Sequence, residues 1–180
     1  RVRAQGADAT LTEAIALERE LLGPLVEASH VIDTSELRPN TLRTWVRQLV
    51  DSPRADLILA FESFAFKNGV PVAADLVFDV RNLRNPYYEP ELRMLTGRDA
   101  PVIEFLRADT QVLAMLDAIA HFIARWLPSY VADNRHYVTV AIGCTGGRHR
   151  SVYIVEELAR RFASQPSVLV RHRAIEGDSS

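Results

Sequence analysis

One stretch constrains the fold of this chain more than any other: residues 137–151 indicate a strand, a glycine turn and the start of a helix. The stretch begins with the apolar and β-branched run YVTVAI, passes through GCTGG and ends in RHRS. A strand that delivers a loop to a helix N-terminus is typical of α/β domains. Backbone N–H groups in glycine turns and at helix N-termini bind anions. The sequence therefore predicts an α/β fold with an anion site at this loop.

Three cationic side chains stand at the same turn, Arg148, His149 and Arg150. An arginine can bind two oxygens of one phosphate through parallel hydrogen bonds. Gly146 and Gly147 allow the backbone to approach a ligand closely. We therefore expect a phosphate group here, carried either by a small molecule or by a nucleic acid.

The loop also fits a second pattern, because Cys144 is followed by five residues and then by Arg150 and a serine. This C-x5-R-S spacing is that of cysteine-dependent phosphatases, in which a thiolate attacks phosphorus and the arginine holds the phosphoryl oxygens. Gly143 stands where those enzymes usually place a histidine, and Asp79 or Asp99 would have to be the general acid. The alternative is that Cys144 is a small buried hydrophobic residue at a strand end.

Three blocks of the sequence resemble one protein family. The run GCTGGRHRSV at 143–152 resembles the GCTGG[KR]HRSV signature of the RapZ/YvcJ family. Residues 78–88, FDVRNLRNPYY, and 92–99, LRMLTGRD, resemble that family's DVR-x-L-x-NP and LR-x-LTG-x-D block. Residues 63–71, SFAFKNGVP, resemble its SF-x-[FY]K-x-G-x-P block. The resemblance also takes in Ile32-Asp33-Thr34-Ser35 and the Leu42-Arg43 that follows, and it therefore spans nearly the whole chain.

The resemblance implies a domain organisation. Members of the family are bacterial nucleotide-binding proteins with an N-terminal P-loop domain, and some act as adapters for an RNase. The G-x-x-x-x-G-K-[ST] motif of a P-loop does not occur in this sequence. We interpret residues 1–54 as the C-terminal remnant of that P-loop domain and residues 55–176 as the C-terminal ligand- or RNA-binding domain. ATP or GTP binding with weak hydrolysis is expected of the full-length protein. For this chain alone we expect no cofactor and no enzymatic activity.

The resemblance also implies a ligand, because some family members bind glucosamine 6-phosphate. The loop 82–99 is the expected second wall of the site, with Asn85 in a turn and Tyr87 offering its ring and hydroxyl to a sugar. Family members can carry a histidine where Tyr87 stands, a difference that concerns the sugar and not the phosphate. The candidate phosphosugar-binding residues are Cys144, Thr145, Gly146, Gly147, Arg148, His149, Arg150, Ser151, Asn85 and Tyr87.

RNA is the alternative or additional partner. The candidate RNA-binding residues are Arg160, Arg161, Arg171 and Arg173, which could neutralise phosphates without reading bases. RNase-adapter members of the family end in a Lys/Arg-rich tail, whereas this chain ends in the acidic run AIEGDSS. The net charge of −2 does not by itself indicate a nucleic acid partner.

Hydrophobic periodicity predicts the elements of an α/β domain layered as helix–sheet–helix. The expected strands are 29–34, 57–66, 76–81, 137–142 and 168–173, and the expected helices are 7–23, 41–50, 110–128 and 150–163. In such sheets ligands gather at the carboxyl ends of the strands, where the GCTGG loop belongs.

Composition adds a few limits. The single cysteine excludes an internal disulfide and fits a reducing compartment, so we expect a cytoplasmic protein. No apolar run reaches the roughly 18 residues of a membrane span, and no membrane partner is expected. No metal is expected, because His149 stands between two arginines rather than in a cluster of ligands. A protein partner such as an RNase, and a homo-oligomer, are further expectations.

Overall fold

The computed structural model describes residues 10–28 and 57–175 continuously, with positions 32, 34, 39, 42–43 and 45–47 between them. The chain divides into two compact units, residues 1–32 and 33–180. Most of the expected strand 29–34 and half of the expected helix 41–50 lie outside the described residues, as does much of the proposed P-loop remnant. The described residues of that expected helix, 42–43 and 45–47, are helical.

The first unit contains one helix, α1 (Leu11–Ala28). Its start is fixed by a reciprocal pair of hydrogen bonds: the Glu13 carboxylate accepts from the Thr10 N–H at 2.7 Å, and the Thr10 hydroxyl accepts from the Glu13 N–H at 3.3 Å. This is the capping box that a Thr-x-x-Glu sequence favours. The helix was expected to end near Gly23, but it continues through Pro24.

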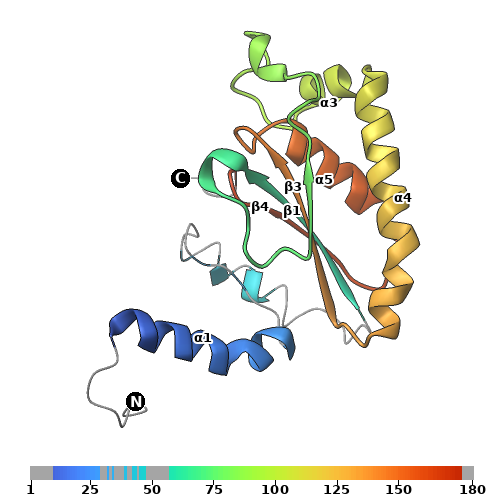
Figure 1. Ribbon diagram of the computed structural model, residues 1–180. Coiled ribbons are helices and arrows are strands. Elements are labelled where there is room, and N and C mark those ends of the chain that lie inside the picture. The colour runs from blue at the N-terminus through green and yellow to red at the C-terminus, as the bar shows by residue number, and fades with distance from the viewer. Residues whose placement is uncertain are drawn as a thin grey trace. The chain divides into compact units, whose positions relative to one another are not determined.

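The second unit is built on a four-stranded parallel sheet, whose strand order is β2-β3-β1-β4 (Figure 1). Its strands are β1 (Ile58–Ala65), β2 (Leu76–Asp79), β3 (Tyr137–Cys144) and β4 (Val168–His172). All four strands predicted after residue 55 are confirmed. The third strand is two residues longer than expected, so that it delivers Cys144 directly to the glycine turn.

Three helices follow within this unit: α3 (Ala100–Arg107), α4 (Thr110–Ala132) and α5 (Arg150–Arg161). Helix α5 packs on β1, β3 and β4, and α4 packs against α5. Figure 1 shows all three helices on one side of the sheet. The described part of the chain thus confirms a parallel sheet with helices against it, and α3, α4 and α5 form one of the two helical layers that were expected.

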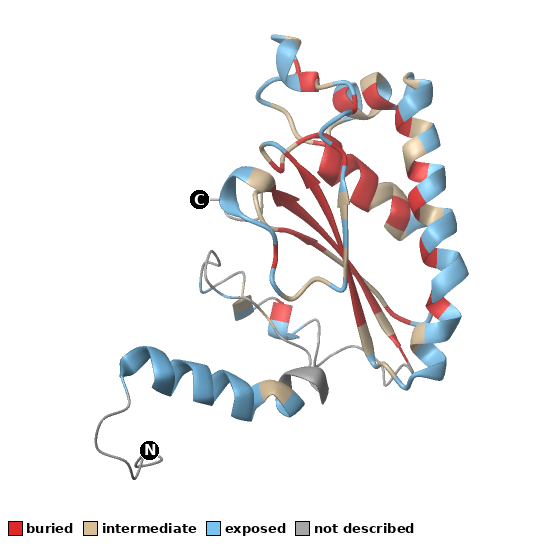
Figure 2. Ribbon diagram, viewed as in Figure 1, coloured by how far each residue is buried: buried red, intermediate tan, exposed pale blue. Residues whose placement is uncertain are grey.

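The core lies between the sheet and α5. Figure 2 shows β1, β3 and α5 as the most buried elements. Phe61 on β1 meets Phe162 at the end of α5 with their ring centroids 5.7 Å apart, and Leu158, Ile154 and Val140 are fully buried beside them. The burial of these large side chains is what holds α5, and therefore the loop before it, in place.

Two further helices differ from the prediction. No helix is predicted over residues 100–107, but this segment forms α3, which has Pro101 in its first turn and buries Val102 and Leu106. Helix α4 was expected to stop at Pro128, but it continues to Ala132. The buried Leu127 and the partly buried Tyr130 keep the last turn packed on the core, which outweighs the hydrogen bond that a proline lacks.

Helix α4 is also long and apolar enough to cross a membrane by length and composition. Within the protein it buries a stripe of residues at helical spacing, among them Val112, Leu116, Ile119 and Ile123, against the core. That stripe is the pattern of a helix that packs on a sheet layer.

Candidate functional site

The candidate site lies at the carboxyl edge of the sheet, as predicted. Strand β3 ends at Cys144, five residues form the turn, and α5 begins at Arg150. Gly147 has φ +68°, a conformation that side chains rarely adopt. A Cβ at Gly147 would also lie 2.7 Å from the Cβ of Ala174 and 3.0 Å from the backbone N of Ala65. A Cβ at Gly146, in contrast, would meet nothing within 4 Å, so the loop is open at that point.

Cys144 stabilises the turn from inside. Its Sγ accepts a hydrogen bond from the Gly147 N–H at 3.2 Å and lies 3.1 Å from the Ser151 hydroxyl. Both Cys144 and Ser151 are buried. These contacts join the end of β3 to the first turn of α5, a structural role that needs no reaction at sulfur.

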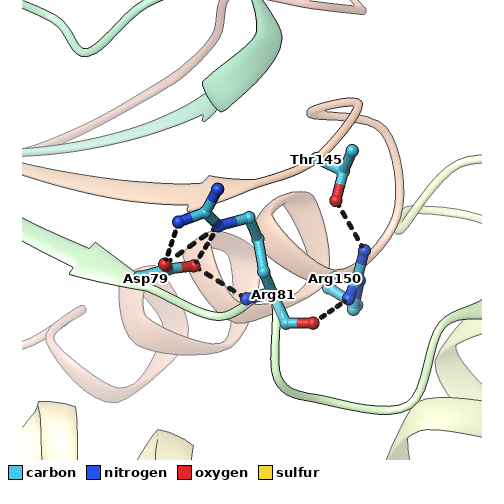
Figure 3. A network of polar contacts seen from close by, with 4 residues as sticks. All are labelled: Asp79, Arg81, Thr145 and Arg150. Carbon is cyan, nitrogen blue, oxygen red and sulfur yellow. Dashed lines mark hydrogen bonds and ion pairs between the residues drawn. The ribbon is translucent and has the colours of Figure 1, made fainter.

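Arg150 joins the two predicted walls of the site. Its Nη1 donates to the backbone carbonyls of Arg81, at 2.6 Å, and Leu83, at 3.1 Å. Its Nη2 donates to the Thr145 hydroxyl at 3.4 Å (Figure 3). The side chain is buried, and its Nε has no hydrogen-bond partner among the described residues. Arg150 therefore tethers the segment after β2 to the glycine turn, and it keeps one N–H donor unused.

An ion pair follows β2 at the same edge. Arg81 binds both carboxylate oxygens of Asp79, with the closest contact at 2.7 Å, and its guanidinium stacks 4.0 Å over the Phe66 ring (Figure 3). The hydrogen bond from Arg81 holds the pKa of Asp79 below its usual range. Asp79 is thus ionised at neutral pH, which makes it a poor general acid for a phosphatase.

His149 contacts the opposite loop. Its Nε2 lies 3.1 Å from the carbonyl oxygen of Leu92, which implies that this nitrogen carries the proton. Burial, assisted by the charges of Arg148 and Arg150, lowers the pKa of His149. The imidazole is therefore neutral at pH 7 and does not supply the positive charge that the sequence suggested.

Gly97 is a residue of the site that the sequence analysis did not single out. Its N–H donates to the Arg148 carbonyl at 2.8 Å. A Cβ at Gly97 would lie 2.3 Å from the His149 carbonyl oxygen and 2.5 Å from the Tyr153 backbone N. Only glycine allows the loop 82–99 to lie this close to the start of α5. The LTG run of the sequence was the available signal for this contact.

Asn85 and Tyr87 have mainly local contacts. The Asn85 side chain caps a short 3-10 helix (Pro86–Tyr88) by accepting from the Tyr87 N–H at 3.3 Å. The Arg93 guanidinium lies 4.9 Å from the centre of the exposed Tyr87 ring. The described contacts that join loop 82–99 to the glycine turn and to Arg150 come from Leu83, Leu92, Met94 and Gly97 instead.

The four candidate RNA-binding arginines do not form one exposed stripe. Arg160 and Arg161 are exposed on α5, where they pair with Glu157 at 2.7 Å and Asp117 at 2.6 Å. Arg173 pairs with the buried Glu62 at 3.3 Å, and Arg171 is only 2% exposed. Of the four, Arg160 and Arg161 are therefore the two placed to meet a large partner at the surface.

A polar chain behind the site was not predicted. The Ser63 hydroxyl lies 2.7 Å from His172 Nδ1, and His172 Nε2 lies 3.1 Å from a carboxylate oxygen of Glu156. Arg98 from loop 82–99 binds the same carboxylate at 2.6 Å. The hydrogen bond with His172, together with Arg98, lowers the pKa of Glu156 to about 2. Ser63 and His172 are fully buried, so this chain stabilises the fold at the edge of the site.

No group of three or more potential metal ligands occurs among the described residues. The site is instead a glycine turn and a helix N-terminus, with Arg150 between two loops and an ionised Asp79–Arg81 pair at the rim. Such an arrangement can bind a phosphate through backbone and guanidinium N–H groups.

Comparison with known proteins agrees with this geometry. Residues 57–176 match the family described as RapZ C-terminal domain. The chain is 60% identical to a nucleotide-binding protein of Bordetella avium over 172 residues, which cover 96% of the chain and 59% of that protein. It is 57% identical to a nucleotide-binding protein of Ralstonia nicotianae over 176 residues, which cover 98% of the chain and 60% of that protein. The chain thus spans about 60% of the length of these relatives, and it belongs to the RapZ family of bacterial nucleotide-binding proteins, of which residues 57–176 are the C-terminal domain.

Proposed function

We propose that the glycine turn and the start of α5 bind the phosphate of a phosphorylated amino sugar such as glucosamine 6-phosphate. The observation that carries the proposal is a set of unused donors at one place. His149 occupies the N-cap position of α5 and makes no capping hydrogen bond with its side chain, so that position leaves the first N–H groups of the helix available. The guanidinium of Arg150, which donates to the Thr145 hydroxyl, adds a positive charge at the same turn.

The open side of Gly146 gives this phosphate its place. A Cβ at Gly146 meets no atom within 4 Å, whereas the neighbouring Gly147 is enclosed by Ala174 and Ala65. The Thr145 hydroxyl, which accepts from Arg150, is next to this opening. A phosphate above Gly146 would reach the turn, Thr145 and the helix N-terminus together.

The Asp79–Arg81 pair supports an amino sugar rather than phosphate alone. Its carboxylate is ionised and partly exposed, and the carbonyl of Arg81 is already fixed by Arg150. An ammonium group of the ligand would find a negative partner in Asp79, at the cost of part of its pairing with Arg81.

In the longer protein we propose a regulatory role for this binding. The relatives are nucleotide-binding proteins, which supports ATP or GTP binding and weak hydrolysis by the part that precedes the described sheet. We further propose that occupancy of the site controls contact with RNA, an RNase or another regulatory protein in the cytoplasm, and that the protein is a homo-oligomer. RNA would contact the protein through the exposed side chains of Arg160 and Arg161.

The test is an isothermal titration of the chain with glucosamine 6-phosphate, glucose 6-phosphate and inorganic phosphate. We expect saturable binding of the first, weaker binding of the other two, and a loss of this preference in Asp79→Asn. Gly146→Ala should weaken binding at least about tenfold, because its methyl group enters the open phosphate position. Arg160→Ala, which alters an exposed arginine away from the turn, is the control and should bind as the parent does. Undiminished binding by Gly146→Ala would show that the ligand lies elsewhere.

The competing function is the cysteine-dependent phosphatase. Its signature would be steady release of inorganic phosphate from the sugar phosphate, abolished by Cys144→Ser. A binding protein should release none, and Cys144→Ser should still bind, since serine can accept the Gly147 N–H bond that Cys144 accepts.

A further inference from the structure

The face of the sheet that points away from α5 carries an unusual set of buried polar groups. Glu156 on α5 contacts His172, and neighbouring residues of a strand point to opposite faces, so Arg171 points away from that helix. Glu62 on β1 is the parallel register partner of Arg171 and shares its face. Both side chains are buried, although neither lies in the hydrophobic core.

The aromatic ring of Trp45, a residue far upstream in the sequence, lies over the Arg171 guanidinium. The guanidinium of Arg171 lies 4.6 Å from the centre of the Trp45 ring and 5.8 Å from the centre of the Tyr137 ring. Trp45 is itself only 2% exposed. Burial raises the pKa of Tyr137 to about 12, which agrees with a face that holds little water.

The hydrogen-bonding capacity of Arg171 is only partly used. Its Nε and Nη2 are buried and have no hydrogen-bond partner among the described residues. Burying such donors is costly, and the two ring faces, together with the charge of the neighbouring Glu62 carboxylate, offset part of this cost. Displacement of Trp45 would therefore cost more free energy than the loss of one apolar contact, because it would also remove a ring that stabilises the buried Arg171 cation.

The segment directly after this strand lies close to the glycine turn. Strand β4 ends at His172, and a Cβ at Gly147 would lie 2.7 Å from the Cβ of Ala174, two residues beyond that end. The Arg173 N–H donates to the Ser63 carbonyl at 3.0 Å, which fixes this end of β4 on β1. A displacement of the turn at Gly147 thus meets the residues that directly follow the strand that holds Arg171.

From these contacts we propose that the sheet face with Glu62, Tyr137 and Arg171 is an intramolecular docking surface for the segment that carries Trp45. We also propose that β4 couples this surface to the Cys144–His149 turn. Trp45 lies before the matched region 57–176, in the part of the chain that leads from upstream sequence to the sheet. Through this surface, the packing of the Trp45 segment on the sheet would depend on the conformation of the Cys144–His149 turn. The regulatory role rests on the proposed function: a ligand bound at the turn would shift the packing of the Trp45 segment through this coupling.

The first experiment tests docking without any ligand. The chain has two tryptophans, so Trp126→Phe leaves Trp45 as the only one. In this background we expect a blue-shifted emission and weak quenching by acrylamide. Arg171→Met keeps an unbranched apolar stem and removes the guanidinium with its charge, and it should raise the quenching constant at least about threefold. Arg161→Met, an exposed arginine on α5, is the matched control and should leave quenching unchanged. Equal quenching in Arg171→Met and the parent would overturn the docking surface.

The second experiment tests the coupling, again without ligand. Gly147→Ala places a methyl group against Ala174, whereas Gly146→Ala in the same turn touches nothing. The first should change the emission and quenching of Trp45, and the second should not. Circular dichroism checks that each variant is folded, and Ala174→Gly, which removes a methyl group from the same contact, takes the place of Gly147→Ala if that variant is unfolded. An unchanged Trp45 signal in a folded variant would overturn the coupling.

Glucosamine 6-phosphate then separates this inference from the proposed function. Saturable heat with a change in Trp45 emission at the same midpoint supports both. Saturable heat with a constant Trp45 emission leaves the phosphosugar function standing and refutes the coupling. If no heat is observed, the phosphosugar function fails, while the two ligand-free experiments still decide the docking surface and its coupling.

Discussion

At the residue scale, the site depends on two glycines that do different work. Gly147 is needed for its backbone conformation, and Gly97 is needed because its missing side chain lets loop 82–99 touch the start of α5. The second requirement is purely steric, since the atoms in the way are backbone atoms of His149 and Tyr153 that are held in the helix.

Gly97→Ala should therefore destabilise the protein by about 1–3 kcal/mol, the usual cost of inserting a methyl group into a packed site. Urea denaturation followed by circular dichroism measures the difference. Gly146→Ala adds the same methyl group in open space, and its free energy of unfolding should lie within about 0.5 kcal/mol of the parent. Equal stability of the two variants would contradict the packing described at Gly97.

A second residue-scale prediction concerns acid stability. His172 and Arg98 lower the pKa of Glu156 from 4.5 to about 2 in the folded protein. A depressed pKa of this kind adds stability that is complete above about pH 4.5 and is lost as the pH falls from 4.5 to 2. Glu156→Gln should remove that part of the pH dependence, as seen in thermal midpoints measured across this range.

The control for this measurement is Glu157→Gln, which changes the next residue of α5 and leaves the His172 contact intact. It should retain the loss of stability between pH 4.5 and pH 2 that Glu156→Gln removes. If both variants keep the slope, the Glu156–His172 hydrogen bond does not contribute to acid stability.

At the element scale, the long helix α4 is started by one side chain. The Asp109 carboxylate accepts from the Gln111 N–H at 2.8 Å in an N-cap geometry. Asp109→Ala should cost about 1 kcal/mol of stability, because a helix N–H loses its partner. Asp109→Asn retains an acceptor oxygen and should cost much less. Chemical denaturation of the two variants side by side provides the comparison, and equal losses would show that the cap does not stabilise the helix.

The elements also show what could be predicted from the sequence and why the rest could not. Local runs of β-branched and apolar residues predict the strands after residue 55, and the two consecutive glycines at 146 and 147 predict the turn. The end of α4 could not be predicted in this way. Pro128 indicates a helix end, but the packing of Leu127 and Tyr130 on the core extends the helix beyond it. Arg150 was correctly placed at the turn, but its hydrogen bonds to the carbonyls of Arg81 and Leu83 depend on a segment far away in the sequence.

The RNA candidates show the same limit. Arg160, Arg161, Arg171 and Arg173 look alike as a basic group in the sequence. Strand alternation and the aromatic cover of Arg171 divide them into two exposed arginines, a partly buried Arg173 paired with Glu62, and a buried Arg171. Periodicity can suggest which face a residue occupies, but it does not identify the distant side chain that covers the face.

At the scale of the whole molecule, the first compact unit is residues 1–32. Most of the apolar side chains of α1 are exposed, among them Leu11, Leu17, Leu21 and Leu25. A helix with so much exposed apolar surface contributes little burial to stability and favours self-association. Deletion of residues 1–32 should leave the thermal midpoint within a few degrees of the parent and reduce association at high concentration. Calorimetry and sedimentation velocity measure the two effects, and a large drop in the midpoint would contradict the division into units.

The parallel sheet has a further consequence, for the way the protein is made. Ile58 at the start of β1 pairs with Tyr137, and Leu59 pairs with Val168. A ribosome therefore releases the apolar strand β1 long before either neighbouring strand exists. Topologies with such distant pairings fold slowly and expose unpaired strands meanwhile. The last of the four strands to be synthesised, β4, is an edge strand that pairs with β1, so the nascent chain already contains the glycine turn after β3 before its sheet is complete.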